Sequence, residues 1–202
     1  AEGLKHKTCR IEILKVSGCD IDDTGGAALA ETTTKTTRLR QLDMSKNTLG
    51  HRTAVALSRG FRLKNGLSSL NLANTGVGNM FLPLFARAIK KSKSHLTNLN
   101  ISKCKLNDKG CKALSIALAS CQKLQNLNVS WNNIGARSMY RLGDSISNNE
   151  SIVSLSVINL KRLSNLKFRS NVNQNNYRFS QEDIKKQETS PEIPTTREVI
   201  KL

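Results

Sequence analysis

The residues that could serve as nucleophiles or metal ligands are few and scattered along the chain. Five cysteines occur without a CxxC pair, and the three histidines are His6, His51 and His95. A zinc site needs several Cys or His ligands close together, and an activated nucleophile needs a base beside it. The sequence therefore predicts no metal site, no cofactor and no enzymatic activity. The unpaired cysteine pattern favours reduced thiols in a cytoplasmic or nuclear protein.

A different chemistry, hydrogen bonding to another protein, is open to polar residues that recur at a regular spacing. The only tryptophan, Trp131, belongs to a column whose members lie 28 or 29 residues apart. Every other member is polar or glycine: Gly18, Lys46, Asn74, Lys103 and Asn159. We therefore expect the column to face solvent. Because tryptophan is enriched at the energetic centres of interfaces, Trp131 is the predicted anchor of a binding site.

An alternative is that Trp131 lies beneath the C-terminal segment and completes the hydrophobic core. Trp131→Ala would leave folding nearly intact if Trp131 is an anchor, and would impair cooperative unfolding if it belongs to the core. Strand residues between the core positions are expected to point into a concave, polar surface. The predicted partner-binding residues on this surface are Trp131, Lys103, Asn128, Asn100, Asn74, Lys46 and Arg40.

Positive charge dominates the chain, which carries 32 Lys and Arg against 15 Asp and Glu, a net charge of +17. A predicted basic patch lies near the ends of two predicted helices and comprises Arg62, Lys64, Arg87, Lys90, Lys91 and Lys93. These cations could simply be solvated near helix C-termini, where the helix dipole favours them, or they could form a flank that attracts an acidic protein partner. Nucleic acid is a weaker alternative, because the aromatic residues on which bases stack make up only 4% of the chain. No run of about 18 apolar residues predicts a membrane span.

The elements that must position these residues repeat along the chain. The first apolar position of each unit recurs in steps of 28 or 29 residues, at Ile11, Leu39, Leu67, Leu96, Leu124 and Ile152. Within a unit the apolar residues first have strand-like spacing and then recur at helical spacing. We therefore expect repeated strand–turn–helix units that stack side by side.

The turn of each of the first five units carries a residue that can form hydrogen bonds, eight positions after the first apolar one. These residues are Cys19, Asn47, Thr75, Cys104 and Asn132. Backbone groups inside a tight turn need partners, so we expect the column to form a ladder of hydrogen bonds. Asp23 and Asp108 are predicted helix N-caps, and Pro83 is predicted in the first turn of its helix.

The segment from Leu124 to Ile134 reads LQNLNVSWNNI and fits the pattern LxxLxLxx(N/C)xL. The chain thereby resembles the leucine-rich repeat family, and its long helical half resembles the ribonuclease-inhibitor-like subclass. The resemblance implies an α/β fold, a right-handed solenoid bent into a horseshoe arc with parallel β-strands on the concave side and α-helices on the convex side. That subclass includes ribonuclease inhibitor, tropomodulin, the Ran GTPase-activating protein and innate immune receptors, so membership alone gives no single function.

Three segments are expected. Residues 1–10 form an N-terminal lead, and residues 11–163 form repeats that start near residues 11, 39, 67, 96, 124 and 152, the last being a partial unit that caps the core. Residues 164–202 form a polar, basic C-terminal tail, largely extended or disordered.

The leading functional hypothesis is a non-enzymatic scaffold that binds a protein partner through the concave face and basic flanks. One alternative is a structural subunit of a cytoskeletal, ciliary, centrosomal or ribonucleoprotein assembly. Another is a GTPase-activating protein of the Ran type, which would need an arginine at a repeat edge, for which Arg40 and Arg52 are the nearest candidates.

Overall fold

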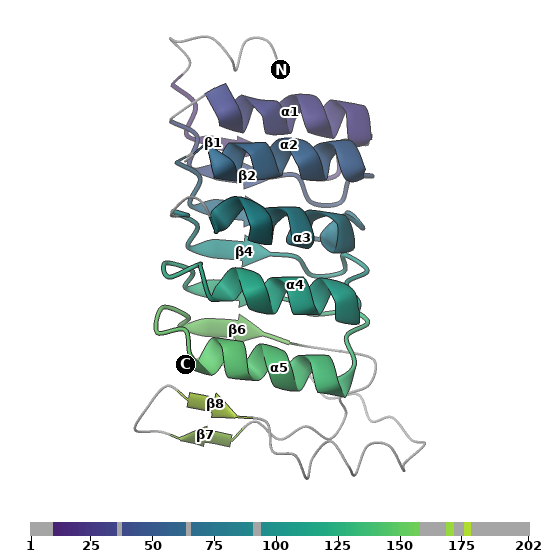
Figure 1. Cartoon of the computed structure of the whole chain (residues 1–202). Coiled ribbons are helices and arrows are strands. Elements are labelled where there is room, and N and C mark those ends of the chain that lie inside the picture. The colour runs from purple at the N-terminus through teal and green to yellow at the C-terminus, as the bar shows by residue number, and fades with distance from the viewer. Residues whose placement is uncertain are drawn as a thin grey trace.

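The structure is a computed structural model, and it describes residues 10–35, 38–63, 66–90, 94–157, 169–171 and 176–178. Strands and helices alternate along the chain (Figure 1). The five strand–helix units are β1 (Ile13–Lys15) with α1 (Asp23–Lys35), β2 (Gln41–Asp43) with α2 (His51–Arg62), β3 (Ser69–Asn71) with α3 (Gly78–Ile89), β4 (Asn98–Asn100) with α4 (Asp108–Leu118), and β5 (Asn126–Asn128) with α5 (Ala136–Ser147). The strand β6 (Ser154–Ser156) follows α5.

The strands β1 to β6 form one sheet in which each strand pairs in parallel with the next along the chain. The central residues of the strands share one register, which aligns Leu14, Leu42, Leu70, Leu99, Leu127 and Leu155. The helices form a second layer over one face of the sheet (Figure 1). The predicted α/β solenoid of stacked strand–turn–helix units is therefore confirmed.

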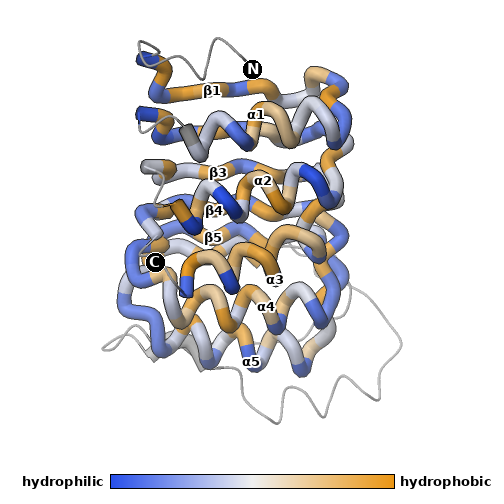
Figure 2. Tube along the Cα trace, turned by 45° about the horizontal axis from the view of Figure 1, so that its top comes forward, coloured by the Kyte–Doolittle hydropathy of each residue, from blue (hydrophilic) through white to orange (hydrophobic). Residues whose placement is uncertain are grey.

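The core lies between the sheet and the helices. Each of the helices α2 to α5 buries an apolar residue at the same position of its unit, and these residues pack against the leucines of the strands: Leu57, Phe85, Leu114 and Leu142. Three phenylalanine rings join α2 to α3, with the Phe61 and Phe85 centroids 4.8 Å apart and those of Phe81 and Phe85 5.1 Å apart. Hydrophilic stretches gather at the two edges of the solenoid, where strands and helices are connected (Figure 2).

The two ends of the array differ from its interior. In the first unit Ile11 is 43% exposed and Ile13 is 53% exposed, and β1 has no partner strand on its outer side in the described sheet. At the other end Ile152 and Leu155 of the sixth unit are buried. The partial unit that was predicted to cap the core at this end continues beyond residue 157, where it lies outside the described residues.

One detail departs from the sequence-based expectations. Pro83 is the sixth residue of α3, because that helix begins at Gly78, so Pro83 lies in the helix interior and not in its first turn. Its ring faces solvent, and its missing N–H leaves no intrahelical bond to the carbonyl of Asn79. The segment predicted as the C-terminal tail contains two short strands, β7 (Arg169–Asn171) and β8 (Asn176–Arg178), which pair antiparallel.

Candidate protein-binding site at the turn edge

The carboxyl ends of β1 to β5 lead into five turns along one edge of the solenoid. We call this the turn edge and define it as residues 16–22, 44–50, 72–77, 101–107 and 129–135. The opposite edge, where each helix ends and the next strand begins, is the helix-end edge. The turn edge carries most of the residues that the sequence predicted for partner binding.

A buried asparagine fixes each of two turns and ties it to the preceding unit. The Asn132 side-chain oxygen accepts hydrogen bonds from the backbone N–H groups of Cys104 (3.0 Å) and Leu106 (2.9 Å). Its amide nitrogen donates to the carbonyls of Ile101 (2.9 Å) and Val129 (2.8 Å). Near the N-terminal end of the array, Asn47 makes the equivalent bonds. Its side-chain oxygen accepts from the backbone N–H groups of Cys19 and Ile21, and its amide nitrogen donates to the carbonyls of Val16 and Met44. The predicted hydrogen-bond ladder is confirmed at these positions.

Smaller side chains occupy the two turns between them. The Thr75 hydroxyl donates to the Leu72 carbonyl at 2.6 Å, and the Cys104 thiol donates to the same carbonyl at 2.8 Å. Each satisfies fewer backbone groups than an asparagine does. All the ladder positions from Asn47 to Asn132 are buried, so the ladder holds the turns but is not itself available to a partner.

The Trp131 column lies directly beside the ladder, in the turns and not in the strands where we expected it. Each described member has a left-handed backbone: φ is +62° at Gly18, +56° at Lys46, +57° at Asn74, +53° at Lys103 and +60° at Trp131. Such φ values cost a residue with a side chain about 1–2 kcal/mol. The backbone N–H of Lys46 donates to Ala73, that of Asn74 to Ser102 and that of Lys103 to Ser130. The hydrogen-bonded sheet therefore continues into this column and sets its spacing.

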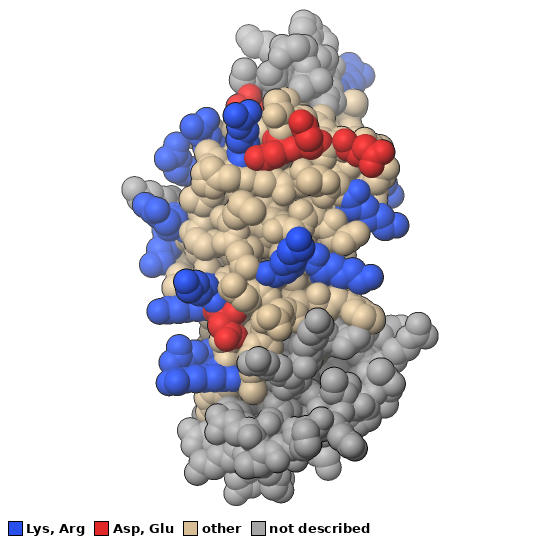
Figure 3. All heavy atoms as spheres, turned by 90° about the vertical axis from the view of Figure 1, so that its right-hand side faces the viewer, with Lys and Arg blue, Asp and Glu red and all other residues tan. Residues whose placement is uncertain are grey.

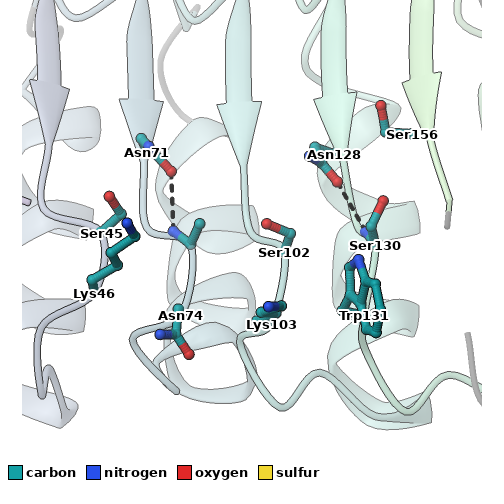
Figure 4. Close-up of a pocket in the computed structure, with 11 residues that line it drawn as sticks. Ser45, Lys46, Asn71, Asn74, Ser102, Lys103, Asn128, Ser130, Trp131 and Ser156 are labelled. Atoms are coloured by element: carbon teal, nitrogen blue, oxygen red, sulfur yellow. Dashed lines mark hydrogen bonds between the residues drawn. The ribbon is translucent and has the colours of Figure 1, made fainter. Parts of the chain in front are cut away.

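The side chains of Trp131 and Lys103 lie side by side at the turn edge (Figure 4). The Lys103 ammonium is 5.1 Å from the centroid of the Trp131 ring, a cation–π contact worth about 0.5–1 kcal/mol at an exposed site. Trp131 is 50% exposed. It is thus a large apolar surface held at a fixed place by a strained turn, next to a positive charge.

A row of amide side chains lies at the ends of the strands, next to this column. The side-chain oxygens of Asn71, Asn100 and Asn128 accept hydrogen bonds from the backbone two residues further on, at 3.0–3.1 Å. The Asn71 amide donates to the Asp43 carboxylate at 3.0 Å. Among the described residues, the amide nitrogens of Asn100 and Asn128 donate to no acceptor, so these donors remain for a ligand.

Asn71 and Asn128, together with residues of the Trp131 column, line a shallow hollow of about 380 Å³ that opens at the turn edge. Of the seven predicted partner-binding residues, Trp131, Lys103, Asn128, Asn74 and Lys46 line it. Asn100 pairs with Asn128 in the adjacent strand. Arg40 precedes β2 and donates from Nη1 to the Gly66 carbonyl at 3.0 Å, which places it at the helix-end edge, away from the hollow.

The predicted basic patch also lies at the helix-end edge. Arg62 is the last residue of α2, Arg87 is in the last turn of α3, and Lys90 directly follows α3. The other members of the patch, Lys64, Lys91 and Lys93, lie outside the described residues. The predicted site residues therefore form two groups on opposite edges and not one continuous surface.

Acidic side chains are unevenly distributed over the turn edge. Figure 3 shows this edge, with most of the acidic groups near the first units, a further acidic group among the later units, and separate clusters of basic groups between uncharged surface. In the sequence, residues 44–107 contain no Asp or Glu but include Lys46, Lys103 and Lys105 at the turns. The hollow thus lies in the basic part of the array, which favours an anionic ligand.

Two aspartates stabilise the turn edge in a way that local sequence reasoning missed. The Asp23 carboxylate accepts bonds from the backbone N–H groups of Gly50 (2.8 Å), Arg52 (3.0 Å) and Thr53 (2.9 Å), so it caps α2 and not its own helix. Asp108 similarly accepts from Gly135 at the start of α5. The prediction that each caps its own helix was therefore wrong. A β-carbon at Gly50 would lie 2.8 Å from Asp23 Oδ2, which explains the glycine there.

These hydrogen bonds change the acidity of Asp23. Partial burial on its own would raise the pKa of this carboxyl, but the bonds donated by Thr53, Arg52 and Gly50 outweigh burial and lower the pKa below its usual value. Asp23 therefore stays ionised, and its negative charge is favourable at the N-terminus of α2.

Three buried cysteines, Cys104, Cys111 and Cys121, are poor nucleophiles. Burial raises the pKa of Cys121 to about 12, and burial together with the nearby Asp108 charge raises the pKa of Cys111 to about 12. Burial also raises the pKa of Cys104. Among the described residues there is no cluster of three or more His, Cys, Asp or Glu side chains arranged to hold a metal ion. Within the same residues, no helix has the length and apolar character needed to cross a bilayer.

The repeated units, the parallel sheet and the asparagine ladder define a class of protein, the leucine-rich repeat solenoids. A family model described as "Leucine Rich repeat" matches residues 10–30, 92–115 and 120–143. The chain belongs to the leucine-rich repeat family, and its units are of the ribonuclease-inhibitor-like type. Proteins of this architecture generally use their extended surfaces to bind other proteins.

Several known proteins are similar to the chain over most of its length. Mouse NACHT, LRR and PYD domains-containing protein 5 is 27% identical over 141 residues, a match that covers 70% of this chain and 10% of that protein. Pig ribonuclease inhibitor is 25% identical over 146 residues, covering 72% of this chain and 26% of that protein. A solved structure of leiomodin-1 actin-binding site 2 aligns with a TM-score of 0.48 and 16% identity, covering 77% of this chain and 75% of that one. The chain spans about a quarter or less of the length of these two curated relatives.

Proposed function

We propose that the protein is a non-enzymatic, intracellular scaffold that binds an acidic protein partner at the turn edge. The observation that carries this proposal is the row of Lys46, Lys103 and Trp131. These exposed side chains stand on a backbone that the sheet holds at regular spacing, and they line a hollow with unused hydrogen-bond donors. Two cations and an aromatic ring on a rigid support are typical of an interface that recognises acidic segments.

The helix-end edge, with Arg40, Arg62, Arg87 and Lys90, is a second basic surface and serves in this proposal as the flank of the scaffold. Its cations lie near helix C-termini, where the helix dipole stabilises them without any partner. We therefore assign it a weaker, electrostatic contribution to association, mainly through the rate of encounter.

Affinity capture with paired variants tests the proposal. The wild-type chain, a turn-edge variant carrying Lys46→Glu, Lys103→Glu and Trp131→Asn, and a helix-end variant carrying Arg62→Glu, Arg87→Glu and Lys90→Glu are each used as bait, and captured proteins are quantified by mass spectrometry. We expect the wild type and the helix-end variant to capture the same acidic proteins, and the turn-edge variant to capture much less of them. Equal capture by all three, or selective loss with the helix-end variant, would refute it.

The remaining hypotheses predict other outcomes. If the protein is a structural subunit, it should capture several members of one assembly. If it binds nucleic acid, nuclease treatment should release the proteins captured with it. A Ran-type GTPase-activating protein would accelerate GTP hydrolysis and lose that effect with Arg40→Ala or Arg52→Ala. Both arginines already donate a hydrogen bond from Nη1, Arg40 to the Gly66 carbonyl and Arg52 to the Thr24 hydroxyl. We therefore assign neither a catalytic role.

A further inference from the structure

The spacing of the charged residues in the hollow constrains the shape of a ligand. Because the backbone bonds of the sheet continue through Lys46, Asn74 and Lys103, these residues are separated by the strand spacing, about 4.8 Å per strand. Lys46 and Lys103 are two strands apart, which gives about 9.6 Å between their backbones. Trp131 follows one strand later, in the same direction.

The hydrogen-bonding character of the hollow constrains the ligand further. In the hollow, the free amide nitrogen of Asn128 and the ammonium groups of Lys46 and Lys103 are donors, and Asn100 adds a free amide nitrogen in the adjacent strand. The carboxylate of Asp43 already accepts from Ser45 and Asn71, and Asn128 uses its side-chain oxygen on Ser130. The hollow therefore offers donors in excess and requires a ligand rich in acceptors, such as carboxylates and unpaired backbone carbonyls.

A protein segment in polyproline II conformation meets both constraints. It rises about 3.1 Å per residue with three residues per turn, so side chains at positions i and i+3 point the same way about 9.3 Å apart. All its carbonyls are free, because this conformation has no internal hydrogen bonds. A β-strand places same-side chains at i and i+2, about 6.7 Å apart, and an α-helix uses its own carbonyls, so both fit less well.

We propose that the turn-edge hollow binds a polyproline II segment that crosses the strand ends, with acidic side chains at i and i+3 paired to Lys46 and Lys103. A proline or other apolar side chain following the second acid packs on Trp131, as proline-rich segments do on aromatic grooves. The inference rests on the proposed function and specifies the conformation and motif of the partner. Pairing of Lys103 with the ligand carboxylate leaves it beside the indole, where it already lies.

Synthetic peptides of equal composition test the spacing. The probes are the acetylated, amidated peptides Pro-Glu-Pro-Pro-Glu-Pro-Pro, with acids at i and i+3, and Pro-Pro-Glu-Pro-Glu-Pro-Pro, with acids at i and i+2. Because Trp131 is the only tryptophan, its emission reports on this site alone. We expect the first peptide to bind about fivefold more tightly, the effect of losing one exposed ion pair. Equal affinity for the two peptides, or no binding of either, would overturn the inference.

Matched variants separate this inference from the proposed function. Lys103→Glu should abolish the spacing preference, whereas Arg87→Glu on the helix-end edge should leave it unchanged. The double variant Lys46→Glu and Lys103→Glu should instead prefer the peptide with lysines at i and i+3. If an acidic protein is captured at the turn edge while the peptides show no spacing preference, the polyproline II inference fails and the proposed function stands. If neither binds, both fail.

Discussion

Both edges of the solenoid carry basic side chains, but they hold these charges in different ways. At the turn edge, Lys46, Lys103 and Trp131 stand on backbone that continues the sheet, next to buried asparagines that bond both their own turn and the preceding one. At the helix-end edge, Arg62, Arg87 and Lys90 are at or next to helix C-termini. Recognition of a particular ligand needs fixed spacing, so the comparison assigns specificity to the turn edge and general attraction to the helix-end edge.

The largest expected effect comes from removing the support of the turn edge. Asn132→Ala would leave the buried N–H groups of Cys104 and Leu106 without their acceptor, at a cost of about 1–3 kcal/mol for each group. We expect the free energy of unfolding, measured by urea denaturation, to fall by about 3 kcal/mol. The adjacent, exposed Asn133→Ala is the matched control and should change it by less than about 0.5 kcal/mol. Equal effects of the two substitutions would contradict the role of the ladder.

Loss of the cap between the first two units should have an intermediate effect. Asp23→Ala removes the acceptor for three backbone N–H groups at the start of α2, those of Gly50, Arg52 and Thr53, and N-cap removal typically costs about 1 kcal/mol. Because the folded state lowers the pKa of Asp23, its contribution is present above the ordinary aspartate pKa and is lost as the pH falls through the lower, folded value. Unfolding free energies measured across acidic pH should therefore decline less steeply in Asp23→Asn than in the wild type.

Substitution of Trp131 should change stability little and binding greatly. Half of the Trp131 surface is exposed and its cation–π contact with Lys103 is worth about 0.5–1 kcal/mol, so Trp131→Ala should lower stability by less than the about 3–5 kcal/mol typical of a buried tryptophan. Trp131→Gly should be more stable than Trp131→Ala by about 1 kcal/mol, because glycine adopts the positive φ of this position without strain. Loss of cooperative unfolding in Trp131→Ala would instead place Trp131 in the core.

The smallest effect is expected at the helix-end edge. Arg87→Glu reverses a charge in the last turn of α3, where the helix dipole favours a cation by about 0.3–1 kcal/mol. Thermal unfolding should therefore shift only slightly, and the affinity of a turn-edge ligand should change less than with Lys103→Glu. A larger loss of affinity with Arg87→Glu than with Lys103→Glu would reverse the assignment of the two edges.

The sequence predicted the parts of the fold that depend on residue type at a fixed period. The leucine columns and the asparagine ladder lie where their spacing indicates, because each unit repeats the same local structure. The left-handed turns were missed, although Gly18 and Asn74 in the Trp131 column are the residues that most readily adopt positive φ. Their presence was a usable signal for the conformation that Trp131 shares.

Other features could not follow from local patterns. Asp23 caps a helix in the next unit, about 30 residues away in sequence, and capping rules consider only the helix that a residue begins. Arg40 and Trp131 were assigned to one surface because both lie outside the apolar positions, but the first precedes a strand and the second follows one. A one-dimensional pattern does not show that these positions lie on opposite edges.

The emission of Trp131 during titration with a captured partner tests the central claim most directly. The chain has one tryptophan, so a change in the emission spectrum reports on Trp131. If this change saturates as partner is added, and does not occur when the partner is mixed with the Lys46→Glu and Lys103→Glu double variant, the partner binds at the turn edge. A tryptophan-free partner segment keeps the signal specific. We predict a saturable blue shift as the half-exposed indole is covered. Binding that is detected by sedimentation but leaves the Trp131 emission unchanged would contradict the account.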